Sequence, residues 1–402
     1  MPVYAYKAKD INGAVVKGEV EFESKEEMIN HLLSRNLFPL DVKAKNTWNT
    51  DLNQLPLFKP KVKTQDIAIF CRQFAVMLES GISIGGTLDI LRKQTSNPSF
   101  REIIQNVHEE VQKGRSLSEA LREHKEFPLI LINMVEAGEV SGNLDSSMNQ
   151  MAIHFEKEMK MQRQIKKAMT YPIIVMVLMV VVVTGMIVFV VPRFVGMFQD
   201  ADAELPGVTL ALMAVSDFMQ AKWYIILGVI ILLIAGFKYI KRYDEVKHLL
   251  DSYALKIPIF GNLNKKIIHA NFSRTLCSLM KAGIPIIQTM EVVKKVVQNT
   301  IAMEVIDHCI DEIKQGGSLA SAMQQSNLFP VMLISMVRIG EESGSLDAIM
   351  DKTAAFYEDE VEVAIDQMTT MISPFITLIM GGVVGFIMLA IIMPMFSLAT
   401  QI

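Results

Sequence analysis

The sequence is poor in the residues on which most enzymes and metal sites depend. Its 402 residues include three cysteines, Cys71, Cys277 and Cys309, and seven scattered histidines, none of which has a second histidine 202 residues further along the chain. The cysteines lack metal-ligand spacing, so we expect small buried side chains in a reducing compartment. No phosphate-binding Gly-rich loop, His-Glu-x-x-His zinc motif or Gly-x-Ser-x-Gly nucleophile elbow occurs. We therefore expect no enzymatic activity and no cofactor, and any energy must come from a partner.

The sequence also lacks the positive charge of a nucleic-acid-binding protein. Lys and Arg number 39 against 43 Asp and Glu, so the net charge is −4, and nucleic acid is not expected as a partner. Hydrophobic residues make up 51% of the chain, and the mean hydropathy is +0.31. Since 20% of the residues are still charged, the composition indicates membrane spans that carry water-exposed domains.

Three apolar runs have about the 20 residues needed to cross the hydrocarbon core of a bilayer. They are residues 173–191, 223–240 and 375–396. Pro172 and Pro374 precede two of them, where a missing N–H costs least, and we expect Pro192 and Pro394 to close them. None of the runs contains Asp, Glu or His, which argues against a proton relay or an intramembrane aspartyl protease.

The distribution of Lys and Arg predicts the orientation in the membrane. Five basic residues at 157–167 precede the first run and four at 238–247 follow the second, whereas the segment between these two runs is acidic. We expect a multi-pass protein of the inner (plasma) membrane with a cytoplasmic N-terminus and an extracytoplasmic C-terminus. The acidic stretch 358–366 before the third run disagrees with this pattern, but acidic residues carry little weight in topology.

The chain contains an internal duplication at a constant offset of 202 residues. Residues from Phe70 to Phe194 align with residues from Phe272 to Phe396 without a gap, including Arg72 with Arg274. In the first copy, apolar periodicity broken by Gly and Pro predicts six helices, the last of which leads directly into the membrane. They are expected at residues 64–80, 84–95, 99–113, 116–124, 128–138 and 143–170.

The expected fold is therefore an all-α membrane protein with two homologous six-helix cytoplasmic bundles and three transmembrane helices. A small α+β (ββαβ) module precedes them, because Asn12-Gly13 between two alternating segments is a strong hairpin signal. This module either binds a partner or docks on the first bundle as an extra layer. The predicted division is 1–45 module, 46–63 linker, 64–170 first repeat, 171–194 first span, 195–222 extracytoplasmic loop, 223–241 second span, 242–372 second repeat and 373–397 third span.

Each repeat contains the segment Gly-Glu-x-Ser-Gly-x-Leu-Asp. One interpretation is structural: the glycines permit a turn, and the Asp lies in the first turn of a helix, where the dipole favours it. The other is a contact or cation site, for which Glu139, Asp145, Glu341 and Asp347 are the candidates, since carboxylates suit hard cations. The complete turn motif is Gly138, Glu139, Gly142 and Asp145, with Gly340, Glu341, Gly344 and Asp347 in the second repeat.

A further set of residues lies at the entry to the first span. Gln164-Ile165, Ala168-Met169, Thr170-Tyr171-Pro172 and the closing Pro192 stand there, and the second repeat keeps Pro374 and Pro394 but has Ser373 in place of Tyr171. With these residues and the duplicated turn motif, the whole chain resembles the inner-membrane platform family of type II secretion and type IV pilus machines, the type II secretion system protein F family.

This resemblance implies a non-enzymatic platform protein that couples a cytoplasmic hexameric assembly ATPase to the extraction and polymerisation of pilin or pseudopilin subunits. It further implies other inner-membrane assembly proteins, membrane lipid and further copies of the chain as partners. The competing interpretation is a transporter or permease component. Transporters need more spans, broken helices and polar residues at the membrane midplane, and the three apolar runs supply few of these.

Overall fold

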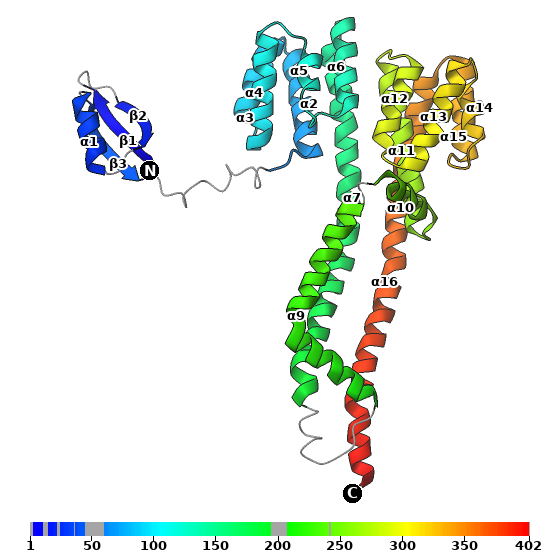
Figure 1. Cartoon of the computed structure of the whole chain (residues 1–402). Helices are drawn as coiled ribbons and strands as arrows, with labels where there is room; N and C mark the ends of the chain where they lie inside the picture. The colour runs from blue at the N-terminus through cyan, green and yellow to red at the C-terminus, as the bar shows by residue number, and fades with distance from the viewer. Residues whose placement is uncertain are drawn as a thin grey trace. The chain divides into compact units, whose positions relative to one another are not determined.

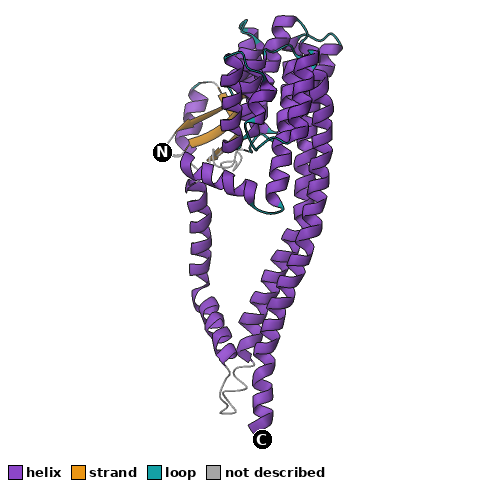
Figure 2. Ribbon diagram, turned by 90° about the vertical axis from the view of Figure 1, so that its right-hand side faces the viewer, coloured by secondary structure: helices purple, strands orange, loops and turns teal. Residues whose placement is uncertain are grey.

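The computed structural model describes residues 3–10, 15–21, 25–35, 37–44, 60–193, 207–240 and 243–401. Contacts between Cα atoms divide the chain into two units, residues 1–62 with 95–102, and residues 63–94 with 103–402. Among the described residues, strands occur only in the first unit, and helices build nearly all of the second (Figures 1 and 2).

The N-terminal part of the first unit contains a three-stranded antiparallel sheet and one helix. The elements are β1 (Val3–Asp10), β2 (Val15–Glu21), α1 (Lys25–Ser34) and β3 (Leu37–Ala44), and the strand order is β2-β1-β3. Met28 and Leu32 of α1 are fully buried and pack against Tyr6 and Leu37. This small core is what one apolar helix face and one sheet face bury together. The Asn12-Gly13 turn lies outside the described residues, as does most of the expected linker.

The first repeat consists of six helices, and the last one continues beyond the bundle. They are α2 (Thr64–Glu79), α3 (Ile84–Gln94), α4 (Pro98–Gln112), α5 (Leu117–Arg122), α6 (Leu129–Ser141) and α7 (Leu144–Gly185). α2 packs along α7, and Phe70 contacts Phe127 with ring centroids 5.8 Å apart. Gly81 and Gly114 adopt positive φ at helix ends, a conformation that glycine adopts without strain.

The second repeat has the same six helices and one more before them. The additional helix is α10 (Asp244–Lys256), followed by α11 (Phe260–Lys281), α12 (Ile286–Val297), α13 (Thr300–Lys314), α14 (Leu319–Gln324), α15 (Val331–Ser343) and α16 (Leu346–Gln401). α10 packs on α11 and α13 and was not anticipated from the sequence. Phe272 contacts Phe329 at 4.9 Å, at the positions equivalent to Phe70 and Phe127.

Pro172, Pro374 and Pro394 do not mark helix ends, so the prediction is wrong for these three, whereas Pro192 lies in the last described helical turn before residue 194. Pro172 lies inside α7, and Pro374 and Pro394 lie inside α16, which continues to Gln401. A proline in a helix removes one backbone hydrogen bond, and apolar helices of membrane proteins tolerate this loss when neighbouring groups compensate. The bundle helix and the apolar segment are therefore parts of one continuous helix in both repeats.

Among the described residues, two helices are long and apolar enough to cross a membrane, namely Leu144–Arg193 and Leu346–Ala390. A third apolar helix, α9 (Gly207–Ile240), is interrupted by the non-helical backbone of Lys222. Its parts Leu210–Lys222 and Leu227–Leu233 are bent by 76°. The segment expected as the loop 195–222 is thus helical from Gly207 onward. Figure 1 shows α7, α9 and α16 extending away from the bundles.

The first part of α9 covers an irregularity in the first apolar helix. Residues Met186–Val190 form a single π-helical turn, η3, in which backbone carbonyls lose their regular α-helical donors. The buried Ser216 hydroxyl donates to the Ile187 carbonyl at 2.8 Å, and the Gln220 amide donates to the Val188 carbonyl at 3.3 Å. These side chains supply donors to the carbonyls of the π-helical turn.

Candidate functional site at the junction of the repeats

The glycines of the duplicated turn motif allow each long helix to approach the preceding one. Gly142 and Gly344 end α6 and α15 with φ of +73° and +66°. A β-carbon at Gly138 would lie 2.7 Å from Ser147 Oγ, and one at Gly340 would lie 2.9 Å from Leu346 Cα. All four positions therefore need glycine, two for the left-handed backbone and two for the close approach.

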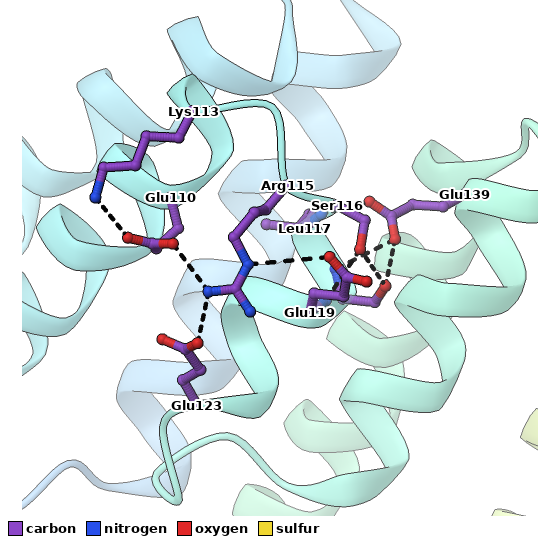
Figure 3. A network of polar contacts seen from close by, with 9 residues as sticks. Glu110, Lys113, Arg115, Ser116, Leu117, Glu119, Glu123 and Glu139 are labelled. Carbon is purple, nitrogen blue, oxygen red and sulfur yellow. Dashed lines mark hydrogen bonds and ion pairs between the residues drawn. The ribbon is translucent and has the colours of Figure 1, made fainter.

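The glutamate of the motif holds the N-terminus of a neighbouring short helix. The Glu139 carboxylate accepts the Leu117 amide at 2.6 Å and both the amide and the hydroxyl of Ser118, at 3.2 and 2.5 Å (Figure 3). Glu341 accepts the amides of Leu319 and Ala320 at 2.6 and 3.0 Å. A carboxylate here satisfies donors that a helix leaves unpaired and complements the helix dipole.

These contacts give the turn motif a structural role. Asp145 and Asp347 lie in the first turns of α7 and α16. Within the described ranges, no three His, Cys, Asp or Glu side chains are grouped so that they could hold a metal ion. Both oxygens of Glu139 and of Glu341 accept hydrogen bonds from α5 and α14, so these carboxylates act as caps.

An arginine connects the first helix of each bundle to the long helix. In the first repeat, Arg72 donates from Nε and Nη2 to the two oxygens of Glu156, both at 2.8 Å, and from Nη1 to Asn149. The hydrogen bond to Arg72 lowers the pKa of Glu156. A bidentate pair of this kind fixes both distance and angle between the partners, so α2 is held against α7.

The equivalent arginine of the second repeat contacts the equivalent residues, but it binds the glutamate through Nε alone. Arg274 donates to Glu358 at 2.6 Å and to Asp351 at 2.7 Å, and these residues correspond to Glu156 and Asn149 at the 202 offset. Lys281 also donates to Asp351 at 2.7 Å, and this bond, with that from Arg274, lowers the pKa of Asp351 to about 2. Arg274 is more buried than Arg72.

The two long helices meet through charges from different repeats. Lys157 of α7 donates to Glu358 of α16 at 2.9 Å, and Lys160 lies 3.5 Å from Glu362. A hydrogen bond from Gln164 lowers the pKa of Glu362, with a further contribution from Lys160. These pairs give the acidic stretch before the third apolar run a role, because its carboxylates face basic residues, including Lys266, which pairs with Glu360 at 2.6 Å.

A cleft of about 610 Å³ lies between the two bundles. Its walls come from the start of α6, from α7, α11 and α16, and from the end of α12. His154 lies in this cleft, and burial lowers the pKa of its imidazole to about 4. In addition, the Gln288 side chain of α12 donates to the Asn133 side chain of α6 at 3.3 Å. The first repeat therefore packs onto the second through α6 and α7.

The residues at the entry to the first span divide into two groups. Gln164 and Ile165 face the second repeat, where Ile165 packs against its core. Tyr171 is exposed, Pro172 is buried inside α7, and Pro192 is exposed in the last helical turn before residue 194. Pro374 is exposed inside α16, and Pro394 lies in the same helix. Tyr171 and the prolines are therefore not brought together with the charged junction.

Sequence reasoning missed most of the residues that form this junction. Arg72 and Arg274 were recognised as equivalent, but their acidic partners were not. A signal existed, since Glu156 and Glu358 also lie 202 residues apart. The contacts between the repeats could not be found in this way, because a duplication reveals what each copy shares and not how one copy packs on the other.

Comparison with known proteins agrees with this architecture. The chain matches the type II secretion system (T2SS) protein F family over residues 70–192 and again over 272–394, and that protein's N-terminal domain over residues 1–43. The two matched regions differ by the offset of 202, which confirms the duplication.

The chain therefore belongs to the type II secretion system protein F family. It is 36% identical to the type IV pilus assembly protein PilC of Thermus thermophilus, over 99% of this chain and 98% of the relative. It is 34% identical to PilC of Myxococcus xanthus, covering 99% and 95%. The type II secretion system protein F of Vibrio cholerae is 28% identical, covering 99% and 98%.

Proposed function

We propose that this protein is the non-enzymatic inner-membrane platform of a type IV pilus or type II secretion machine. It couples a cytoplasmic assembly ATPase to the extraction and polymerisation of pilin or pseudopilin subunits. Relatives named for pilus assembly and for secretion support this role. The ATPase binds the bundles, pilins contact the apolar helices, and other assembly proteins and lipid surround them.

One observation carries the proposal: each bundle is attached to an unbroken helix that continues into an apolar segment. Arg72 fixes the first bundle to α7, and Arg274 fixes the second to α16. A helix transmits displacement along its axis, because each turn is hydrogen-bonded to the next. Force applied to a bundle therefore reaches the membrane without a flexible connection.

The topology that we propose has three spans, formed by α7 with η3, the second part of α9, and α16. The bundles and the N-terminal ββαβ module lie in the cytoplasm and the C-terminus outside, with the division into domains set out above from the sequence. The basic residues at 157–167 support this orientation. Fusing a reporter that is active only outside the cytoplasm to residue 401 and to residue 250 tests it, and activity at 250 alone contradicts it.

Helix stiffness can be tested at Lys166 and Lys167, which are exposed in α7 between the bundle and the apolar segment. Replacing both by Gly or both by Ala removes the same charges, but each Gly costs about 1 kcal/mol of helix stability relative to Ala. We expect the Ala pair to support filament assembly or secretion in a strain that lacks the native gene. The Gly pair is expected to insert into the membrane, to retain the ATPase on purification and to lose assembly.

The two parts of the proposal fail separately. If the Gly pair assembles filaments as well as the Ala pair does, a stiff connection is not required. If the intact chain does not retain the ATPase on co-purification from membranes, the bundles are not its binding site. Retention by the full chain but not by a chain without the first repeat assigns the contact to residues 64–170.

A further inference from the structure

The bundle helices of the two repeats contact each other through different faces, and this arrangement leaves the equivalent face uncovered on each repeat. Helices α6 and α7 of the first repeat pack against α11, α12 and α16 of the second. In Figure 1, α6 lies beside α12, whereas the equivalent helix α15 lies beyond α12, within its own bundle. A contact between two different faces of similar units leaves the complementary faces free at the ends.

The open face of the second repeat is apolar. Its residues are equivalent to the residues of the first repeat that lie in the contact between the repeats. Leu129, Ile130, His154 and Met161 line the cleft between the bundles. Their equivalents at the 202 offset are Val331, Met332, Phe356 and Val363. These side chains are 80%, 42%, 40% and 48% exposed, although Ile130 is 1% and His154 7% exposed. We call this set the α15–α16 face.

The open face of the first repeat is apolar as well. Asn271 of α11 lines the cleft and Ser278 of the same helix is buried. Their equivalents on α2 are Ile69 and Val76, which are 46% and 51% exposed and lie seven residues apart on one side of that helix. We call this pair the α2 face. Apolar residues thus stand on both faces that the internal contact leaves uncovered.

We propose that the α15–α16 face of one chain docks on the α2 face of a second copy, repeating between chains the contact made within the chain. A second copy is the occupant because each open face corresponds, position by position, to a face that is already covered by a repeat of the same fold. α7 and α16 also run in the same direction from their bundles (Figure 1), so such a contact keeps the apolar segments of both chains in one membrane.

The internal hydrogen bond between Gln288 and Asn133 predicts one contact between chains. The equivalent positions are Gly86 in the first repeat and Ser335 in the second. We would co-express two differently tagged full-length copies, one carrying Gly86→Cys and the other Ser335→Cys, and treat membranes with a short bis-maleimide. The native cysteines are buried and give little background. The control pair is Val140→Cys with Ser335→Cys, because Val140 is exposed outside both faces.

Charge substitutions provide a second test by co-purification of the two tags. Val331→Glu with Met332→Glu, or Ile69→Glu alone, should lower co-purification at least ten-fold when both copies carry the change. Val140→Glu, which introduces the residue that the second repeat has at 342, should have no effect. A copy with the 331 and 332 changes mixed with an Ile69→Glu copy should recover association, because one intact pair of faces remains between them.

Cross-linking of the Gly86 and Ser335 copies together with recovery in the mixed pair supports the proposal. If wild-type copies co-purify but the Gly86→Cys and Ser335→Cys copies do not cross-link, the contact between chains lies elsewhere and the proposal is overturned. Wild-type copies that do not co-purify also overturn it, and the faces then belong to a different protein. Neither measurement uses filament assembly or secretion, so the result is independent of the proposed function.

Discussion

Lys160 and Glu362 occupy the same position in the two repeats, and their side chains approach to 3.5 Å between α7 and α16. Two identical copies would bring two identical charges together here. The duplicated helices can pack in this way because the residues at this position have opposite charges, supported by the Lys157–Glu358 pair at 2.9 Å. This local difference between the copies stabilises their association.

Reversing one charge of this pair should weaken the contact between the long helices. Lys160→Glu places a carboxylate beside Glu362, and Glu362→Lys places an ammonium beside Lys160. Since both side chains are largely exposed, each change should lower the melting temperature only slightly. The exchange of both residues should restore the melting temperature of the purified protein at low salt. If the double exchange is no better than either single change, the pair does not contribute.

Loss of the second arginine should be more harmful than loss of the first. Arg274→Ala leaves Glu358 and Asp351 without a shared, mostly buried partner and should cost about 3 kcal/mol. Arg72→Ala opens a more exposed pair and should cost about 1 kcal/mol. Chemical denaturation of the two variants in the same detergent measures the difference. Equal losses would show that burial of Arg274 does not strengthen its interactions.

The two kinds of glycine in the turn motif should respond differently to alanine. Gly340→Ala forces a β-carbon to within 2.9 Å of the Leu346 Cα, so α15 and α16 must separate, at a cost of about 2–3 kcal/mol. Gly344→Ala meets no atom within 4 Å but strains the left-handed backbone, at about 1 kcal/mol. Thermal unfolding of the two variants gives the order, and a larger loss for Gly344→Ala contradicts this account.

Acid should loosen the contact between the bundles through His154. Burial lowers the pKa of His154 to about 4, against about 6.5 in an unfolded chain. Between these values the unfolded state binds more protons, so stability is complete above about pH 6.5 and falls as the pH drops to 4. The loss approaches about 3 kcal/mol for this residue.

A variant tests this pH dependence directly. His154→Phe introduces the residue that the second repeat has at position 356, and it should flatten the decrease in stability between pH 6.5 and 4. His269 titrates in the same range, since burial lowers its pKa to about 4 as well, and it remains as an internal reference. An unchanged slope in the variant would mean that His154 is not protonated on unfolding.

Much of the architecture was predictable from local patterns. The first five helices of the first repeat lie close to their predicted bounds, because apolar periodicity and Gly or Pro punctuation are local signals. The error at the prolines has a related cause. The local sequence around Pro172 predicts the start of a helix. Because the segments before and after it are both helical, α7 continues through this proline. α10 was missed because the first repeat has no counterpart.

The sequence alone determined the duplication, the apolar segments and the turn motif, because each depends on residues that are close in the chain or on identity between the copies. Only the tertiary structure decided that Glu139 caps α5, that Lys157 pairs with Glu358 and that Ser216 supplies a donor to the π-helical turn. Each contact joins residues far apart in sequence, and which partners meet depends on how whole helices pack. That packing is set by many side chains together and is not encoded in any single motif.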